Sequence, residues 1–160
     1  MSFSLSEEGL AELDRLLSRY PDRAAAVLPA LHLVQSEHGH VPDEAIAWVA
    51  ERVGLSPAHV EGVATFYTLF ERRPRGRHHL QICRNLSCSL MGAEALVAHV
   101  SAKLGIRPGE TTPDGMFTLS VVECLGSCGT APVMQVGDAY HENLTVEAVD
   151  ALIDRLRAEG

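Results

Sequence analysis

The four cysteines constrain the fold of this chain more than any other feature. Cys83 and Cys88 are separated by four residues, Cys124 and Cys128 by three, and the sequence contains no other cysteine. Each pair follows an apolar run that predicts a β-strand, "HHLQIC" and "MFTLSVVE", and a run of helical periodicity, "MGAEALVAHVSAKLG", lies between the strands. Two strands joined through a helix are expected to be parallel neighbours in one sheet. We therefore expect Cys83 and Cys124 to end the strands, Cys88 and Cys128 to lie in the loops beyond, and all four thiols to meet at one sheet edge.

Four thiols at one edge can serve several purposes. A structural zinc ion takes four thiolates and tolerates these spacings. A [2Fe-2S] cluster also takes four thiolates, two per iron, and a four-residue gap occurs in plant-type ferredoxins. A redox dithiol would favour C-x-x-C, which is absent, and inert buried cysteines would not be expected to pair at two matching positions. Spacing and topology favour the cluster and leave zinc as the main alternative.

The residues beside the cysteines favour an all-cysteine site for an anionic group. Gly126 and Gly129 flank Cys128, and glycines permit tight loops whose backbone N–H groups can point at sulfur. No histidine lies in either loop as a further candidate ligand.

The first part of the chain, up to about residue 70, has the pattern of a small helical bundle. Ser4 with Glu7 fits a capping box, and Ser56 followed by proline fits the start of another helix. Gly39 and Gly54 are placed as helix C-terminal caps, Pro42 suits a first helical turn, and Pro29 predicts a kink or restart. The segment "ERRPRGR" then predicts a linker.

The second part predicts an α/β arrangement. Its order is strand, helix, strand, a hairpin at Gly137-Asp138, and a last helix capped by Thr145. The expected fold class is therefore α+β, with an N-terminal helical domain and linker over residues 1–76 and an α/β domain over residues 77–160.

The composition and the N-terminal sequence indicate which class of protein, which partners and which compartment to expect. The chain is 46% hydrophobic and 21% charged, which is typical of a globular protein. A net charge of −8 argues against nucleic-acid binding, so we expect protein partners. The N-terminus lacks a basic region followed by an apolar core, and no apolar run approaches the ~18 residues of a membrane span. We expect a cytoplasmic protein without direct membrane insertion, in a compartment where disulfides seldom persist.

Other polar residues have ordinary interpretations. His38 and His40 lie near a predicted helix end, where partial positive charge is favourable, and we expect neither these two nor His78 and His79 to form a metal site. No Ser-His-Asp set, paired-carboxylate signature, G-x-G-x-x-G or P-loop is visible. The chain alone is thus not expected to be a complete enzyme.

Two further groups of side chains lie near the linker. The first group is aromatic: Phe66, Tyr67 and Phe70. Helical spacing predicts that these side chains belong mainly to the core, with partner docking as the alternative. The second group is expected to be a solvated linker or a docking edge and consists of Arg72, Arg73, Arg75 and Arg77.

Several stretches together resemble one known family. "CRNLSCSLMGAEAL", "GETTPDGMFTL", "VECLGSCGTAPVMQV" and "YHENLT" are similar to the small [2Fe-2S] subunit of the NADH-dehydrogenase module of respiratory complex I, the NuoE type. Related subunits occur in NAD-linked formate dehydrogenases and bidirectional hydrogenases. "GVATFYTLF" and the helices before it extend the resemblance to nearly the whole chain. The resemblance implies a thioredoxin-like ferredoxin domain over residues 77–160. It also implies that one cluster is bound by Cys83, Cys88, Cys124 and Cys128.

The same resemblance implies a role. The chain would be an electron-transfer subunit of NADH:quinone oxidoreductase, not catalytic alone, with its cluster near the FMN of a larger partner. That NuoF-type partner would hold both FMN and NADH, and the assembly would be peripheral on the cytoplasmic side of the inner membrane. "CGTAPVM", without a further cysteine, is closer to the complex I branch than to the formate dehydrogenase branch. The alternatives are a zinc-stabilised interaction module and the equivalent subunit of a formate dehydrogenase or hydrogenase.

Overall fold

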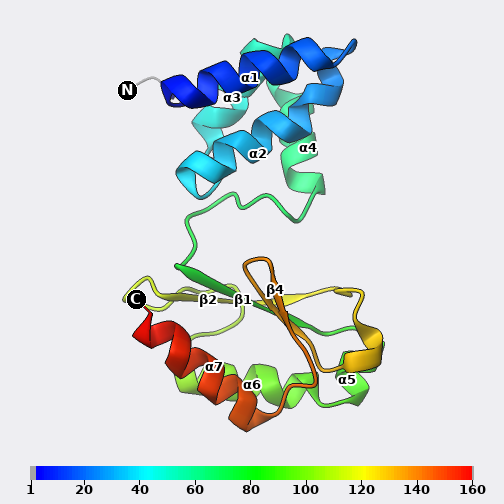
Figure 1. The fold of residues 1–160 in the computed structure, drawn as a ribbon, viewed down its shortest axis with the longest axis vertical. Coiled ribbons are helices and arrows are strands. Elements are labelled where there is room, and N and C mark those ends of the chain that lie inside the picture. Colours follow the sequence, from blue (N-terminus) through cyan, green and yellow to red (C-terminus); the bar gives the residue numbers. More distant parts are fainter. Residues whose placement is uncertain (1–2, 160) are drawn as a thin grey trace. The chain divides into compact units, whose positions relative to one another are not determined.

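The structure, a computed structural model, describes residues 3–159 and separates into two compact units, Met1–Pro74 and Arg75–Gly160. The first unit is helical, and the second combines a four-stranded sheet with helices (Figure 1). The α+β class predicted from the sequence is therefore confirmed. Among the described residues, no helix is both long enough and apolar enough to cross a membrane.

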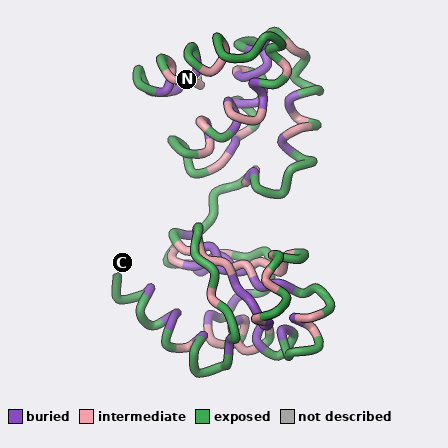
Figure 2. The backbone as a smooth tube through the Cα atoms, turned by 45° about the vertical axis from the view of Figure 1, so that its right-hand side comes forward, coloured by how far each residue is buried: buried purple, intermediate pink, exposed green. Residues whose placement is uncertain are grey.

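The helical unit is built from amphipathic segments with clear ends. Gly39 and Gly54 adopt left-handed backbone conformations after the second and third α-helices, as predicted, and Ser56 caps the fourth by accepting a hydrogen bond from the His59 N–H. Their apolar faces enclose one core, seen as the inward-facing buried segments of this unit in Figure 2. The elements are α1 (Glu7–Arg19), η1 (Arg23–Ala26), α2 (Val27–His38), α3 (Asp43–Val53) and α4 (Pro57–Phe66).

The beginnings of two helices differ from prediction. Ser6, not Ser4, caps α1 and accepts from the Gly9 N–H at 3.0 Å. Glu37 of α2 fixes this cap, because its carboxylate accepts from the Ser6 N–H at 2.9 Å and from the Ser6 hydroxyl at 2.7 Å. This tertiary contact outweighs the local capping-box spacing. Pro42 is the N-cap residue of α3 and lies just before its first turn.

The aromatic and arginine predictions are only partly right. Phe70 is 5% exposed and belongs to the core, but Phe66 is 77% exposed and Tyr67 is 38% exposed. Helix α4 ends at Phe66, and Tyr67 continues in an extended conformation. Arg72 is not a solvated linker residue. Its guanidinium bonds to the carboxylates of Asp43 and Glu61, and also to the Val41 carbonyl, so it fastens the segment after α4 to the bundle.

The second unit contains the predicted order of strands and helices. Strand β1 pairs in parallel with β2 and antiparallel with β3, and β3 pairs antiparallel with β4, giving the order β2-β1-β3-β4. Helices α6 and α7 lie on the same face of the sheet in Figure 1. The elements are β1 (His78–Cys83), α5 (Leu86–Leu90), α6 (Ala93–Leu104), β2 (Phe117–Val122), η2 (Cys128–Thr130), β3 (Met134–Val136), β4 (Ala139–His141) and α7 (Val146–Ala158).

The core of this unit lies between the sheet and the two long helices. Leu80 and Ile82 of β1, Phe117 and Leu119 of β2 and Ile153 of α7 are completely buried. Burying one such side chain contributes about 1.5–3 kcal/mol to stability. This packing makes the sheet a rigid support for the residues at its edge.

The chain enters the sheet unit through a close backbone contact. The Gly76 N–H donates to the Thr118 hydroxyl at 2.6 Å, and a β-carbon at residue 76 would lie 2.8 Å from the Phe117 carbonyl carbon. Arg75 then bonds to His79 at 2.8 Å. The end of the predicted linker therefore packs on the sheet.

Candidate metal centre

The structure brings the four cysteines to the end of the parallel pair β1 and β2. Cys83 is the last residue of β1 and lies in register with Val122, the last residue of β2. Cys124 lies two residues beyond that strand and does not end it as predicted. Cys88 and Cys128 were expected in loops, but Cys88 belongs to α5 and Cys128 begins η2. The sheet topology therefore brings the cysteines to the ends of the parallel strands, but short helices replace the two predicted loops.

The thiols form two pairs. The Cys124 and Cys128 sulfurs are 3.6 Å apart, and the Cys83 and Cys88 thiols are hydrogen-bonded to each other. A tetrahedral metal with metal–sulfur bonds of about 2.3 Å holds two thiolates about 3.8 Å apart. The spacing of the second pair thus suits two ligands of one metal ion.

The two pairs lie near each other. Helix α5 contacts η2, and Cys128 is close enough to Cys83 and Cys88 for their charges to interact. Over residues 3–159, no three His, Cys, Asp or Glu side chains gather around one metal position. Two thiolates on each of two irons is the arrangement that a [2Fe-2S] cluster requires.

Backbone N–H groups point at the first sulfur of each pair. Burial by itself would raise the pKa of the Cys83 thiol, but hydrogen bonds from the N–H groups of Asn85 and Leu125 and from the Cys88 thiol hold it below its ordinary value. The Gly126 N–H lies 3.4 Å from the Cys124 sulfur, and Gly126 has a φ of 82°, in the left-handed region. The Cys83 sulfur is thus prepared to carry negative charge, and the Cys124 sulfur has a backbone N–H group directed at it.

The second sulfur of each pair is less favourable as a free thiolate. Burial is the main cause that raises the pKa of Cys88, and the hydrogen bond from the Val133 N–H only partly opposes it. The neighbouring Cys124 thiol raises the pKa of Cys128. Such sulfurs are stable as thiolates when a cation neutralises them. The donor set, all sulfur with N–H groups aimed at it, fits an iron–sulfur cluster.

Two contacts around the cysteines were not foreseen in the sequence. Arg84 and Glu123, the neighbours of Cys83 and Cys124, form an ion pair of 2.7 Å across the strand ends. Asn85 caps α5 with its side chain. The first contact joins residues far apart in sequence, whereas an Asn three residues before Cys88 is a local signal that could have predicted a helix start.

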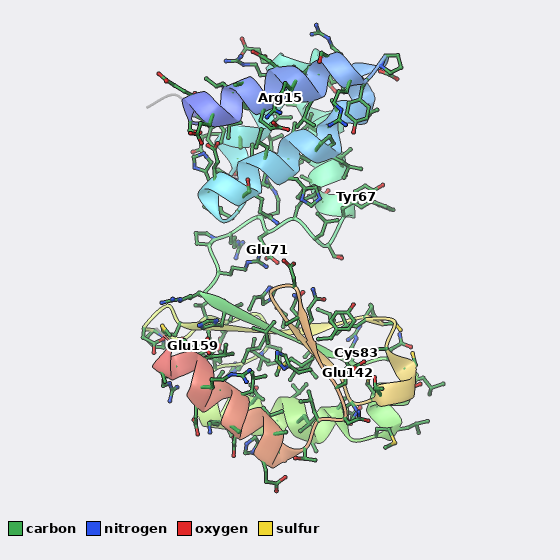
Figure 3. All side chains as sticks on the ribbon, in the orientation of Figure 1. Arg15, Tyr67, Glu71, Cys83, Glu142 and Glu159 are labelled. Carbon is green, nitrogen blue, oxygen red and sulfur yellow. The ribbon has the colours of Figure 1, made fainter. Side chains whose placement is uncertain are left out.

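The segment after Cys124 is held by the hairpin β3–β4. The Tyr140 hydroxyl donates to the Leu125 carbonyl at 2.8 Å, and the Glu142 carboxylate accepts from the Thr130 hydroxyl at 2.6 Å. Figure 3 labels Cys83 at the end of β1 and Glu142 directly after β4. No sequence spacing indicated these contacts, because they join residues 12 to 15 positions apart without periodicity.

His38 and His79 take structural positions. His38 ends α2 and packs against Phe3 with ring centroids 4.7 Å apart. His79 is buried on β1 and bonds to the Ser120 hydroxyl at 2.7 Å. Burial, with the nearby Arg75 charge, lowers the pKa of His79 to about 4, so its ring is neutral at pH 7.

Several known proteins are similar to this chain over most of its length. The sequence profile of the thioredoxin-like [2Fe-2S] ferredoxin family matches residues 13–157. A protein of Rhizobium meliloti, named as a subunit of NADH-quinone oxidoreductase, is 55% identical over 92% of this chain and 88% of its own length. NADH-quinone oxidoreductase subunit 2 of Thermus thermophilus is 48% identical over 91% of this chain and 82% of its own.

A solved structure has the same fold. It is the NAD+-reducing [NiFe]-hydrogenase in its H2-reduced state, with a TM-score of 0.75 and 26% identity. The match covers 86% of the present chain and 23% of the hydrogenase chain. The present chain is thus similar to one part of a much longer polypeptide.

Proposed function

The chain belongs to the thioredoxin-like [2Fe-2S] ferredoxin family, and from this we propose that it is the electron-transfer subunit of an NADH dehydrogenase module, carrying one [2Fe-2S] cluster. The proposed ligands are Cys83, Cys88, Cys124 and Cys128. The observation that carries the proposal is the arrangement of these thiols as two pairs at the end of two parallel strands.

The residues of the chain give the site its chemistry. A bound [2Fe-2S] cluster supplies one-electron transfer. The Asn85, Leu125 and Gly126 N–H groups stabilise negative charge on sulfur, and buried Cys83 and Cys88 limit the access of water to one side of the site. An all-thiolate site favours a low reduction potential, with plant-type clusters near roughly −400 mV as a reference.

The proposed partner is a flavin- and NADH-binding subunit of the NuoF type, which would hold both FMN and NADH. Support comes from the relatives, which are named as subunits of NADH-quinone oxidoreductase. It also comes from the sequence, which shows no nucleotide-binding motif. A flavin takes electrons from NADH as a pair and can release them singly, so a one-electron carrier beside it has a clear use. The assembly would be peripheral on the cytoplasmic side of the inner membrane.

A second parent complex is also supported by a specific observation. The fold matches one part of an NAD+-reducing hydrogenase, so the same module could serve a hydrogenase. The much higher identity to the oxidoreductase subunits over most of their length favours respiratory complex I.

The partner proposal is tested by purifying the tagged chain from its native host at low salt. We expect a flavoprotein to copurify and the complex to oxidise NADH with ferricyanide, while the isolated chain oxidises none. Dithionite should fully reduce the cluster in both samples. Nickel in the purified complex would assign the chain to a hydrogenase. A chain that purifies alone, without flavin or NADH activity, would contradict the proposed function.

A further inference from the structure

The segment that carries the second thiol pair has little burial of its own. We call residues 124–130 the ligand loop. None of its residues is buried, and both Cys124 and Cys128 are exposed. A segment with few buried contacts opens easily unless other groups hold it. Its contacts with the hairpin β3–β4 are therefore important for the geometry of the site.

Tyr140 of β4 holds the beginning of the ligand loop. Its hydroxyl donates to the Leu125 carbonyl at 2.8 Å. Leu125 follows Cys124 directly. The hydrogen bond thus connects the hairpin β3–β4 to the backbone beside a proposed ligand, and a shift of Tyr140 would move that backbone.

Glu142, the first residue after β4, holds the end of the ligand loop. The same carboxylate oxygen accepts from the Thr130 hydroxyl at 2.6 Å and from the Ser127 hydroxyl. These two residues lie on either side of Cys128. The Asn143 N–H donates to the Thr130 carbonyl at 2.7 Å. Hydrogen bonds to a charged acceptor are stronger than neutral ones, and Glu142 makes two of them to residues on either side of Cys128.

We propose that Tyr140 and Glu142 are positioning residues that clamp the ligand loop, and that the Glu142 charge helps to keep the reduction potential of the site low. The inference rests on the proposed function. Reduction adds negative charge, and a carboxylate near Cys128 disfavours that addition. The hydrogen bonds of the clamp should slow the loss of iron from the exposed pair Cys124 and Cys128. The negative charge of Glu142 should make the reduction potential of the cluster more negative.

Four single variants of the full chain separate these effects. Tyr140→Phe removes one hydrogen bond without changing charge, Glu142→Ala removes the carboxylate clamp, and Glu142→Gln keeps an acceptor oxygen but removes the charge. Asp138→Asn is the matched control. It removes the same charge at the turn before β4, about 13 Å from residue 142 along an extended strand.

The first measurement is the rate of iron release to an excess of chelator, followed by loss of visible absorbance under anaerobic conditions. Tyr140→Phe should release iron a few times faster than wild type, and Glu142→Ala roughly tenfold faster, as expected for losing hydrogen bonds to a charged group. Asp138→Asn should release iron at the wild-type rate. A variant that no longer retains iron but has the wild-type far-UV circular dichroism also supports the clamp.

The second measurement is an EPR-monitored redox titration. Glu142→Gln should shift the midpoint to a less negative potential, while Tyr140→Phe and Asp138→Asn should leave it near the wild-type value. Wild-type iron release in both Tyr140→Phe and Glu142→Ala would overturn the clamp. An equal shift in Glu142→Gln and Asp138→Asn would overturn the local role of the charge. Wild-type protein without iron and sulfide would instead overturn the proposed function.

Discussion

Arg84 and Glu123 form an ion pair that joins the ends of the two parallel strands, with 2.7 Å between Arg84 Nη2 and Glu123 Oε1. Arg84 follows Cys83 directly and Glu123 precedes Cys124 directly. Their side chains are 63% and 69% exposed, so the pair contributes little to folding, about 0–1 kcal/mol. Its two opposite charges nevertheless lie beside the proposed cluster.

Removing either charge should therefore shift the midpoint potential of the cluster and leave the free energy of unfolding almost unchanged. Arg84→Ala should make the midpoint potential more negative, because the Glu123 carboxylate loses its partner, and Glu123→Gln should make it less negative. Both variants should change the free energy of unfolding by less than about 1 kcal/mol. Redox titrations at low and high salt check this, since screening should reduce both shifts. Arg84→Lys is the charge-preserving control, and shifts of the same sign in Arg84→Ala and Glu123→Gln would contradict the explanation.

Gly76 should tolerate no larger side chain. In Gly76→Ala, the new β-carbon would lie 2.8 Å and 2.9 Å from backbone atoms of Phe117, so the sheet must shift, at a cost of about 1–3 kcal/mol. Gly62→Ala is the control. Its β-carbon meets nothing within 4 Å in the described structure, and replacing a helical glycine should stabilise α4 by about 0.5–1 kcal/mol.

Urea unfolding checks both glycine variants. Trp48, the only tryptophan, lies on α3 of the helical unit, so its fluorescence reports that unit, while far-UV circular dichroism reports both units. Gly62→Ala should raise the fluorescence midpoint. Gly76→Ala should lower the urea midpoint of the dichroism transition of the sheet unit. Wild-type stability in this variant would show that the close contact is absent.

His79 should make stability depend on pH. Its pKa is lowered from 6.5 to about 4, chiefly by burial, so between these values the unfolded chain binds a proton that the folded chain does not. Stability should therefore fall as pH falls from 6.5 towards 4, with a limiting slope of about 1.4 kcal/mol per pH unit.

The comparison with His79→Gln isolates this contribution, because acid effects on the cysteine site are common to both proteins. Between pH 7 and pH 5, the urea midpoint of unfolding should fall further for the wild-type protein than for His79→Gln. An equal fall in the two proteins would mean that His79 takes up its proton in the folded state.

Loss of a proposed ligand should remove the cluster whether that cysteine is buried or exposed. Cys88→Ala leaves a small gap at a buried position and removes a proposed ligand, whereas Cys124→Ala removes one at an exposed position. Both should lose the cluster, and because ligation is coupled to folding of the surrounding segments, both should also be less stable than wild type. Metal analysis and thermal unfolding check this, with Ser89→Ala, a substitution next to Cys88, as the control that should retain iron. Unchanged iron in either cysteine variant would remove that residue from the ligand set.

Much of the architecture could be predicted because it depends on local signals. Gly39 and Gly54 end helices where the sequence placed them, and the Gly137-Asp138 turn forms the expected hairpin. The parallel pairing of β1 and β2 follows from the helical crossover, and it places Cys83 in register with Val122, two residues before Cys124.

The features that were missed depend on tertiary contacts or on short elements. Helix α5 has only five residues, too few for a clear period. Glu37 of α2 binds Ser6 and so determines which serine caps α1. Phe66 is exposed at the last residue of its helix. The hydrogen bond from the Thr130 hydroxyl to Glu142 likewise joins two segments that only the folded sheet brings together.

The central claim is that the four thiols bind one [2Fe-2S] cluster. The most direct measurement is the iron, zinc and acid-labile sulfide content of anaerobically purified wild-type protein, with an EPR spectrum after dithionite reduction. About two irons and two sulfides per chain, no stoichiometric zinc, and a single spin-half signal at low temperature are expected. One zinc ion per chain, with no sulfide and no visible absorbance, would contradict the claim and favour a zinc-stabilised module.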